Sequence, residues 1–203
     1  MSKRAASMAE LDIAMMPGEV DLLREASRNR HHVIEFGCGG STILFLENAV
    51  EALDSVESDK AWAAKVCGEP SAAAALRSGR FRMHNVDIGR TKAWGYPVDD
   101  ASKALWPRYS RAIWRNLEPP AVDFVFIDGR FRVACALVAL LHIGTPALIA
   151  VHDFWSRPKL YGEILQFLDV VQRVQSLGIF APRGDIDEIR VKKLLRVYLT
   201  DPR

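Results

Sequence analysis

Cysteine, charge of one sign and long hydrophobic runs are all scarce in this sequence. The 203 residues include three cysteines, widely spaced, with neither a C-x-x-C motif nor a disulfide ladder. They are Cys38, Cys67 and Cys135. This spacing excludes a disulfide-stapled secreted scaffold and favours a reducing compartment. The 27 Lys and Arg residues nearly balance the 25 Asp and Glu residues, so the net charge of +2 does not favour nucleic acid as a partner.

No hydrophobic run approaches the roughly 18 consecutive apolar residues of a membrane-spanning helix. The longest one covers only residues 133–141. The first residues are basic, but no apolar segment follows them, so no signal peptide is predicted. We therefore expect a cytoplasmic protein with no membrane partner.

What the sequence does contain is typical of one packed globular domain. Apolar residues make up 49% of the chain and charged residues 26%. At roughly 100–200 residues per domain, the length predicts a single domain over residues 1–203. Strands are expected at 32–37, 52–57, 81–87, 122–129 and 147–151. Helices are expected from Pro17, at 41–50, 59–67, 71–75, 132–142 and 158–168, and from an N-cap at Asp185 to about Leu199.

This alternation predicts an α/β fold with a doubly wound, mostly parallel sheet and helices on both faces. An antiparallel hairpin at 169–182 would bring the sheet to about seven strands. Right-handed crossovers place the carboxyl ends of the parallel strands along one edge, where ligands of such sheets bind. The residues expected at that edge are Gly37, Glu57, Asp87, Asp128 and His152.

A glycine-rich loop joins the first expected strand to the following helix, in the sequence Glu35-Phe-Gly-Cys-Gly-Gly-Ser-Thr. Gly37 and Gly39 allow a sharp turn and close approach of the backbone to a ligand. The helix that follows presents unpaired N–H groups to that ligand. Thr42 stands where the third glycine of a dinucleotide-binding G-x-G-x-x-G motif would be. The simpler alternative is a tight turn with Ser41 or Thr42 as N-cap.

Two acidic residues accompany this loop. Glu35 lies in an otherwise apolar strand, where a carboxylate is costly unless it is hydrogen-bonded or paired. An ion pair with Arg24 or Arg28 would be a purely structural explanation. Glu57 follows Gly37 by 20 residues and ends the second strand, and an acid at this offset can accept both hydroxyls of a ribose.

Four segments together resemble the class I, Rossmann-like S-adenosylmethionine-dependent methyltransferases. They are V-I-E-F-G-C-G-G-S-T at 33–42, S-V-E-S-D at 55–59, N-V-D-I-G at 85–89 and D-F-V-F-I-D-G at 123–129. The resemblance covers roughly residues 17–182, and its first segment is the most specific.

The resemblance implies a binding site for S-adenosylmethionine. Glu35 and the glycines would hold its methionine end, Glu57 its ribose, and Asp87 the adenine amino group between two apolar walls. Asp128 would face the cofactor amine or the site of methyl transfer. The full implied set is Glu35, Gly37, Cys38, Gly39, Gly40, Ser41, Thr42, Glu57, Ser58, Val86, Asp87, Ile88 and Asp128. Turn-forming roles for Asp87, before Gly89, and for Asp128-Gly129 stay open.

Three residues are the candidates for catalysis: Asp128, His152 and Asp153. His152 and Asp153 directly follow the fifth strand, and a histidine can act as general base near neutral pH. Capping of the strand edge and of the next helix is the alternative. Some small O-methyltransferases bind a divalent metal with acids at these strand ends. Because Arg130 stands where a further ligand is expected, a metal is not the favoured reading and no metal ligand is assigned.

The segment 88–120 interrupts the strand–helix rhythm and is expected to be an acceptor-side lid. Its aromatic residues could stack on a flat small-molecule acceptor, and Arg108, Arg111 and Arg115 could pair with an anionic one, although core packing and a solvated face explain many of them. Three other functions stay open: an NAD-dependent oxidoreductase, a cofactor- or partner-binding protein without catalysis, and an RNA-modifying enzyme. A homo-oligomer is also left open.

Overall fold

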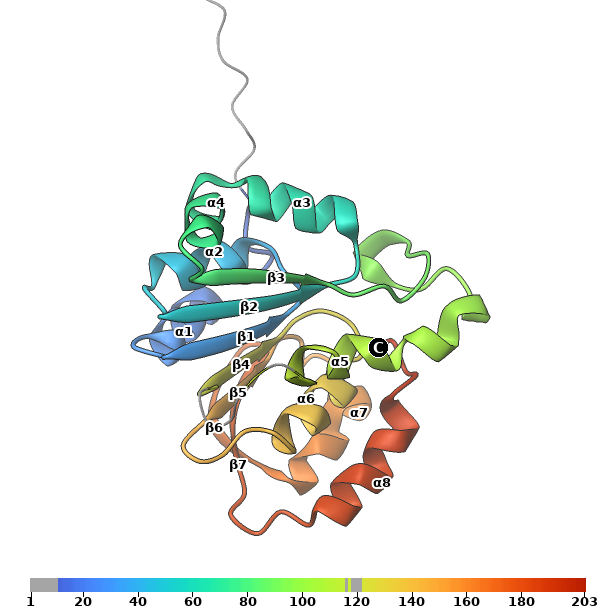
Figure 1. Ribbon diagram of the computed structural model, residues 1–203. Helices are drawn as coiled ribbons and strands as arrows, with labels where there is room; N and C mark the ends of the chain where they lie inside the picture. The colour runs from blue at the N-terminus through green and yellow to red at the C-terminus, as the bar shows by residue number, and fades with distance from the viewer. Residues whose placement is uncertain (1–10, 116, 118–121) are drawn as a thin grey trace, which may run out of the picture.

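Seven strands and eight α-helices make up the computed structural model, which describes residues 11–115, 117 and 122–203 (Figure 1). The expected absence of a signal peptide concerns residues outside this range, as does part of the 88–120 segment. The strands are β1 His32–Phe36, β2 Ala52–Glu57, β3 Phe81–Asn85, β4 Phe124–Ile127, β5 Leu148–Val151, β6 Leu168–Val174 and β7 Leu177–Pro182. The helices are α1 Pro17–Ser27, α2 Gly40–Glu47, α3 Lys60–Gly68, α4 Pro70–Arg77, α5 Pro107–Arg111, α6 Arg132–Leu140, α7 Pro158–Tyr161 and α8 Glu188–Tyr198.

The strands form one sheet in the order β3-β2-β1-β4-β5-β7-β6. The first five are parallel, while β7 runs antiparallel to both β5 and β6. This confirms the doubly wound, mostly parallel sheet and its antiparallel carboxy-terminal hairpin. Among the described residues, no helix is long and apolar enough to cross a lipid bilayer.

Alternating side chains of β1 divide the interior into two cores. Ile34 and Phe36 pack in the core under α5, α6 and α8, while Val33 points into the core under α1, α2 and α4. The two groups of helices lie on opposite faces of the sheet (Figure 1). Glu35 shares the second face, which brings its carboxylate to the start of α2.

The order of the sheet reverses at β1, which has β2 on one side and β4 on the other. Beyond its end, Gly37 N donates to Val56 O at 2.9 Å, and Asp128 N and Gly129 N donate to Phe36 O at 2.9 and 2.7 Å. The loops after β1 and β4 are therefore in direct contact. The expected meeting of these strand ends at one edge is confirmed.

Several expected boundaries were wrong for local reasons. The helix expected at 158–168 ends at Tyr161, because a 3-10 turn (Gly162–Gln166) leads directly into the pairing of β6. The last helix has Asp187, not Asp185, as N-cap, since Asp187 Oδ1 accepts from the N–H groups of Ile189 and Arg190. Strand β3 stops at Asn85 and does not reach residue 87.

Helix α2 differs from the expectation in its cap. It begins at Gly40 after Gly39, so neither Ser41 nor Thr42 occupies the N-cap position. The Thr42 hydroxyl reaches back and accepts from Gly39 N at 3.0 Å. The threonine thus supports the turn from inside the helix.

Candidate active site

Glu35 lies directly beneath the glycine-rich loop and is fully buried. Its Oε1 accepts from the Ser41 hydroxyl at 2.5 Å, and its Oε2 accepts from the Thr42 and Ser55 hydroxyls at 2.6 and 2.5 Å. Both oxygens are occupied by hydroxyl groups, so the alternative of an ion pair with an arginine of α1 is wrong. In this arrangement Glu35 fixes the loop and does not present its carboxylate to a ligand.

The environment of Glu35 also changes its acidity. Burial raises the pKa of Glu35 to about 7, against the opposing effect of the three hydroxyl donors. The carboxyl group is therefore partly protonated near neutral pH.

The loop itself depends on glycine at two positions. Gly37 has φ of +92°, and a Cβ there would lie 2.6 Å from Gly129 N. A Cβ at Gly40 would lie 2.7 Å from both Leu11 O and Ile13 N. The loop is consequently held between the turn after β4 and the segment that precedes α1.

Glu57 lies beside this loop at the end of β2. Its Oε1 accepts from Ser58 N at 2.6 Å and Asp59 N at 2.9 Å. Its Oε2 lies 3.8 Å from the Sγ atom of Cys38, in the middle of the glycine-rich loop. The structure therefore brings the loop and the spaced acid together, and Oε2 has only this weak thiol donor among the described residues.

The three residues expected around adenine differ in burial. Val86 and Ile88 are buried in the core, whereas the Asp87 side chain is exposed. Asp87 Oδ1 accepts from Gly89 N at 2.9 Å and so closes the turn after β3. The turn-forming role of Asp87 is present in the structure, and its role toward adenine stays a prediction.

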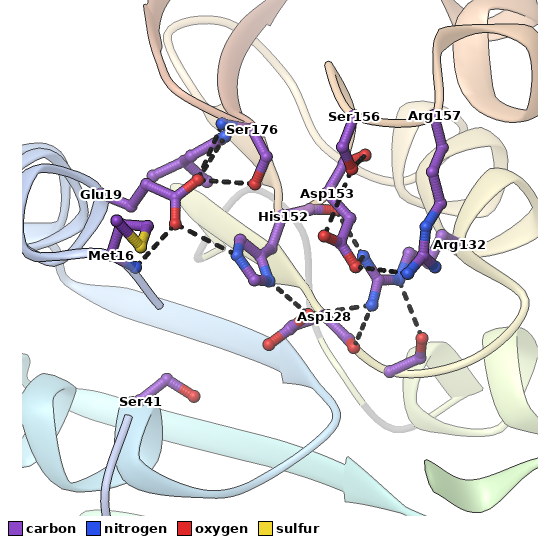
Figure 2. Close-up of polar contacts among 12 residues, drawn as sticks. Met16, Glu19, Ser41, Asp128, Arg132, His152, Asp153, Ser156, Arg157 and Ser176 are labelled. Atoms are coloured by element: carbon purple, nitrogen blue, oxygen red, sulfur yellow. Dashed lines mark hydrogen bonds and ion pairs between the residues drawn. The ribbon is translucent and has the colours of Figure 1, made fainter. Parts of the chain in front are cut away.

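At the ends of β4 and β5, a chain of polar contacts links Asp128, His152 and Glu19 (Figure 2). His152 Nδ1 lies 2.8 Å from Asp128 Oδ1, and its Nε2 lies 3.4 Å from Glu19 Oε2. Glu19 also accepts from Met16 N at 2.9 Å and from the N–H and hydroxyl of Ser176 at 2.8 and 2.5 Å. This network joins α1 and the β6–β7 turn to the strand ends.

The network favours the charged form of His152. Burial alone would lower the pKa of His152, but the hydrogen bond and negative charge of Asp128, with Asp153 and Glu19 adding to them, raise it. For Glu19, burial acts to raise the pKa, yet the donors from Ser176 and Met16 lower it. Both ring nitrogens of His152 lie against carboxylates in this arrangement, and its role as general base stays a prediction.

Arg132 stands between the two aspartates of the site. Its guanidinium lies 3.0 Å from Asp128 Oδ1 and 3.3 Å from Asp153 Oδ2, and its side chain is buried (Figure 2). Ligand atoms of Asp128, His152 and Asp153 lie within 4.8 Å of one another, a spacing that would suit a metal ion. Because an arginine already holds both carboxylates, these residues do not fit a resident divalent cation.

Two cavities are near these elements. One of about 440 Å³ opens beside His152 and is lined by Ile13, Met16, Glu19, Asp153, Gln175 and Ser176 among others. The other, of about 480 Å³, lies between the α5–Arg115 segment, α6 and α8 and is lined by Arg111, Arg115, Lys192 and Arg196 around Trp114. Of the three arginines that could pair with an anionic acceptor, Arg111 and Arg115 therefore line a different cavity from the one beside His152.

Comparison with solved structures decides the family. No protein-family model and no curated protein matches the chain. A methyltransferase-like protein from Silicibacter pomeroyi is 31% identical and has a TM-score of 0.79, with 95% of this chain and 99% of that chain covered. The chain belongs to the class I S-adenosylmethionine-dependent methyltransferase family.

More distant members of the methyltransferase fold show the same architecture. An O-methyltransferase from Streptomyces achromogenes, solved with S-adenosylmethionine, is 18% identical, with 85% of this chain and 83% of that chain covered and a TM-score of 0.56. An O-methyltransferase from Bacillus cereus, solved with S-adenosylhomocysteine, is 15% identical, with 87% and 85% covered and a TM-score of 0.54. At these identities the likeness concerns the fold alone.

Two residues of this methyltransferase-family site were not singled out from the sequence. Glu19 is the third residue of a helix that opens with Pro17-Gly18, and nothing local indicates that it contacts the end of β5. Arg132 did carry a signal, because it starts an otherwise apolar helix in which every residue is buried. A charged side chain in such a helix needs buried partners.

Proposed function

We propose that this chain is a methyltransferase that binds S-adenosylmethionine and transfers its methyl group to a small-molecule acceptor. The observation that carries the proposal is the contact between the glycine-rich loop and Glu57, with Cys38 Sγ and Glu57 Oε2 3.8 Å apart. A carboxylate beside such a loop suits an adenosyl group, whose ribose hydroxyls need an acceptor close to the turn.

The chain's own residues have distinct parts in this proposal. Glu57 accepts the ribose hydroxyls, while Glu35 acts from beneath by holding Ser41 and Thr42. The N–H groups at the start of α2 and the side chain of Asp128 serve the methionine end. The cofactor supplies a methyl group on a sulfonium, already activated for displacement.

The acceptor would enter from the 440 Å³ cavity beside His152. Asp128 orients His152 through Nδ1, which leaves Nε2 facing Glu19 at the longer distance of 3.4 Å. An acceptor hydroxyl that displaced Glu19 would meet Nε2, and the neutral form of His152, with its proton on Nδ1 toward Asp128, would take the hydroxyl proton. In this proposal residues 1–203 form one domain, and the segment 88–120 is its acceptor-side lid.

Two observations bear on the alternatives. The fully buried Thr42 side chain, bonded to Glu35 and Gly39, fills the place of the third glycine of a dinucleotide site, which counts against NAD. Binding without catalysis is a second candidate, because both nitrogens of His152 are engaged by carboxylates.

Calorimetric titration separates these functions. We expect S-adenosylmethionine and S-adenosylhomocysteine to bind saturably with one molecule per chain, and NAD to give no binding heat. Binding of NAD alone, or of none of the three compounds, would contradict the proposal. Cofactor binding with no methyl transfer across a broad acceptor screen would support the non-catalytic candidate.

A further inference from the structure

Arg130 is a buried cation with incomplete hydrogen bonding. It follows β4 by three residues and is 7% exposed. Its Nε and Nη1 atoms are buried and have no hydrogen-bond partner, and within the described residues it forms no ion pair. A buried guanidinium without an anion costs several kcal/mol, so a persistent one indicates a partner that arrives from outside the chain.

No carboxylate among the described residues forms an ion pair with Arg130, and those nearest the site contact other groups. Asp128 contacts both Arg132 and His152. Glu57 Oε1 accepts from two backbone N–H groups. Arg130 is thus the one cation of this edge, among the described residues, whose buried donors have no acceptor.

Arg130 also lies close to the end of β2, where Glu57 is. A Cβ at Gly95 would lie 3.6 Å from Arg130 Cγ and 3.7 Å from the Ser58 hydroxyl, next to Glu57. The guanidinium packs 4.1 Å from the centroid of the Tyr96 ring. Arg130 therefore lies between the turn after β4 and a short hairpin, residues 91–97, that also contacts the end of β2.

The hairpin 91–97 covers the Arg130 guanidinium with its Tyr96 ring. An isolated bridge joins Thr91 to Pro97, Lys92 N donates to Tyr96 O at 2.8 Å, and Trp94 and Gly95 have positive φ. Its tip, Trp94, is 80% exposed. Tyr96, next to this tip, is the residue whose ring covers the guanidinium.

We infer that Arg130 binds an anionic group, a carboxylate or a phosphate, of the methyl acceptor. This rests on the proposed function and narrows its substrate class to small anions. The planar fork of arginine pairs with either group through two parallel hydrogen bonds. The carboxylate of the cofactor itself could pair with Arg130 in the same way. The experiment therefore distinguishes an anionic group of the acceptor from the carboxylate of the cofactor.

The test compares the wild type with Arg130→Gln and Arg130→Lys, and with Arg90→Gln as a control at an exposed arginine beside the same hairpin. Each protein is saturated with S-adenosylhomocysteine and titrated with benzoate, phenyl phosphate and inorganic phosphate, with the heat of binding as readout. We expect at least one anion to bind the wild type and Arg90→Gln equally. Arg130→Gln should weaken the binding of that anion at least tenfold, and Arg130→Lys should weaken it less. Circular dichroism verifies the fold of each variant.

Cofactor titrations identify the source of the anion. If Arg130 serves the acceptor, Arg130→Gln binds S-adenosylhomocysteine and 5′-methylthioadenosine as the wild type does. Loss of affinity for S-adenosylhomocysteine alone, which carries the carboxylate, would assign Arg130 to the cofactor and overturn the inference. So would equal anion binding by wild type and Arg130→Gln, or none by the wild type. If no variant binds S-adenosylhomocysteine, the proposed function fails, and anion titration of the free protein still decides the role of Arg130.

Discussion

Arg132→Met is expected to lower the free energy of unfolding by about 3 kcal/mol. The guanidinium bonds Asp128 Oδ1 at 3.0 Å, Asp128 O at 2.8 Å and Gly129 O at 3.0 Å, and also contacts Asp153 and the carbonyl of His152. Methionine fills a similar volume but leaves two carboxylates and three carbonyl oxygens without this donor. Removing one partner from a buried ionic network lowers the free energy of unfolding by more than the intact network contributes to it, because the remaining charges stay buried without a partner.

Urea denaturation measures this change, and Arg157→Met is its matched control. Arg157 also pairs with Asp153, at 3.3 Å, but its side chain is 42% exposed, so its loss should cost at most about 1 kcal/mol. Magnesium chloride should not raise the midpoint of the wild type, because Arg132 occupies the position between the carboxylates. Equal losses for the two variants, or a magnesium-dependent rise in the wild type, would show that Arg132 is not the cation of this site.

Glu35→Gln is expected to stabilise the protein at high pH and to change little at low pH. The pKa of Glu35 is raised from 4.5 to about 7 in the folded state. Between these values the folded state keeps a proton that the unfolded state has released, so the contribution of Glu35 to stability falls as pH rises. The glutamine at this position does not titrate, so above pH 7 the free energy of unfolding of the variant should exceed that of the wild type by on the order of 3 kcal/mol.

The measurement is the difference in unfolding free energy between variant and wild type from pH 5 to pH 8. Glu47→Gln, at an exposed glutamate that ends helix α2, is the control and should show no pH-dependent difference. A Glu35→Gln difference that is constant across this range would mean that Glu35 is ionised in the folded protein throughout. The raised pKa would then be wrong.

Much of the fold could be predicted from local sequence. Strand β2 matches its expected bounds, and β1 ends one residue before the expected Gly37. The fourth strand covers only Phe124–Ile127 of the expected 122–129. The ends of β1 and β2 are marked in the sequence by the glycine-rich loop and by the capping Asp59. The segment from Pro158 to Leu168 misleads a prediction from local sequence, because its apolar spacing suits a helix along its whole length. The pairing of Leu168 with Pro182, a contact across the hairpin, ends the helix early.

In the site, too, contacts between residues close in sequence could be predicted, and contacts between distant residues could not. Glu35, the glycine-rich loop and Glu57 are close in sequence, and the offset of 20 residues predicts their meeting. The contact between His152 and Glu19 joins residues 133 positions apart, and no local pattern indicates it. The engagement of both His152 nitrogens and the contacts of Arg132 with both aspartates depend on such tertiary contacts, which the sequence does not indicate.

The most direct test of the cofactor cradle is the dissociation constant of S-adenosylhomocysteine for the wild type and for Glu57→Gln. Glutamine can still accept from the N–H groups of Ser58 and Asp59, but it has one acceptor oxygen fewer for the ribose hydroxyls. We expect the constant to rise at least tenfold, while the exposed control Glu51→Gln binds as the wild type does. Unchanged binding by Glu57→Gln would contradict the assignment of this edge as the adenosyl site.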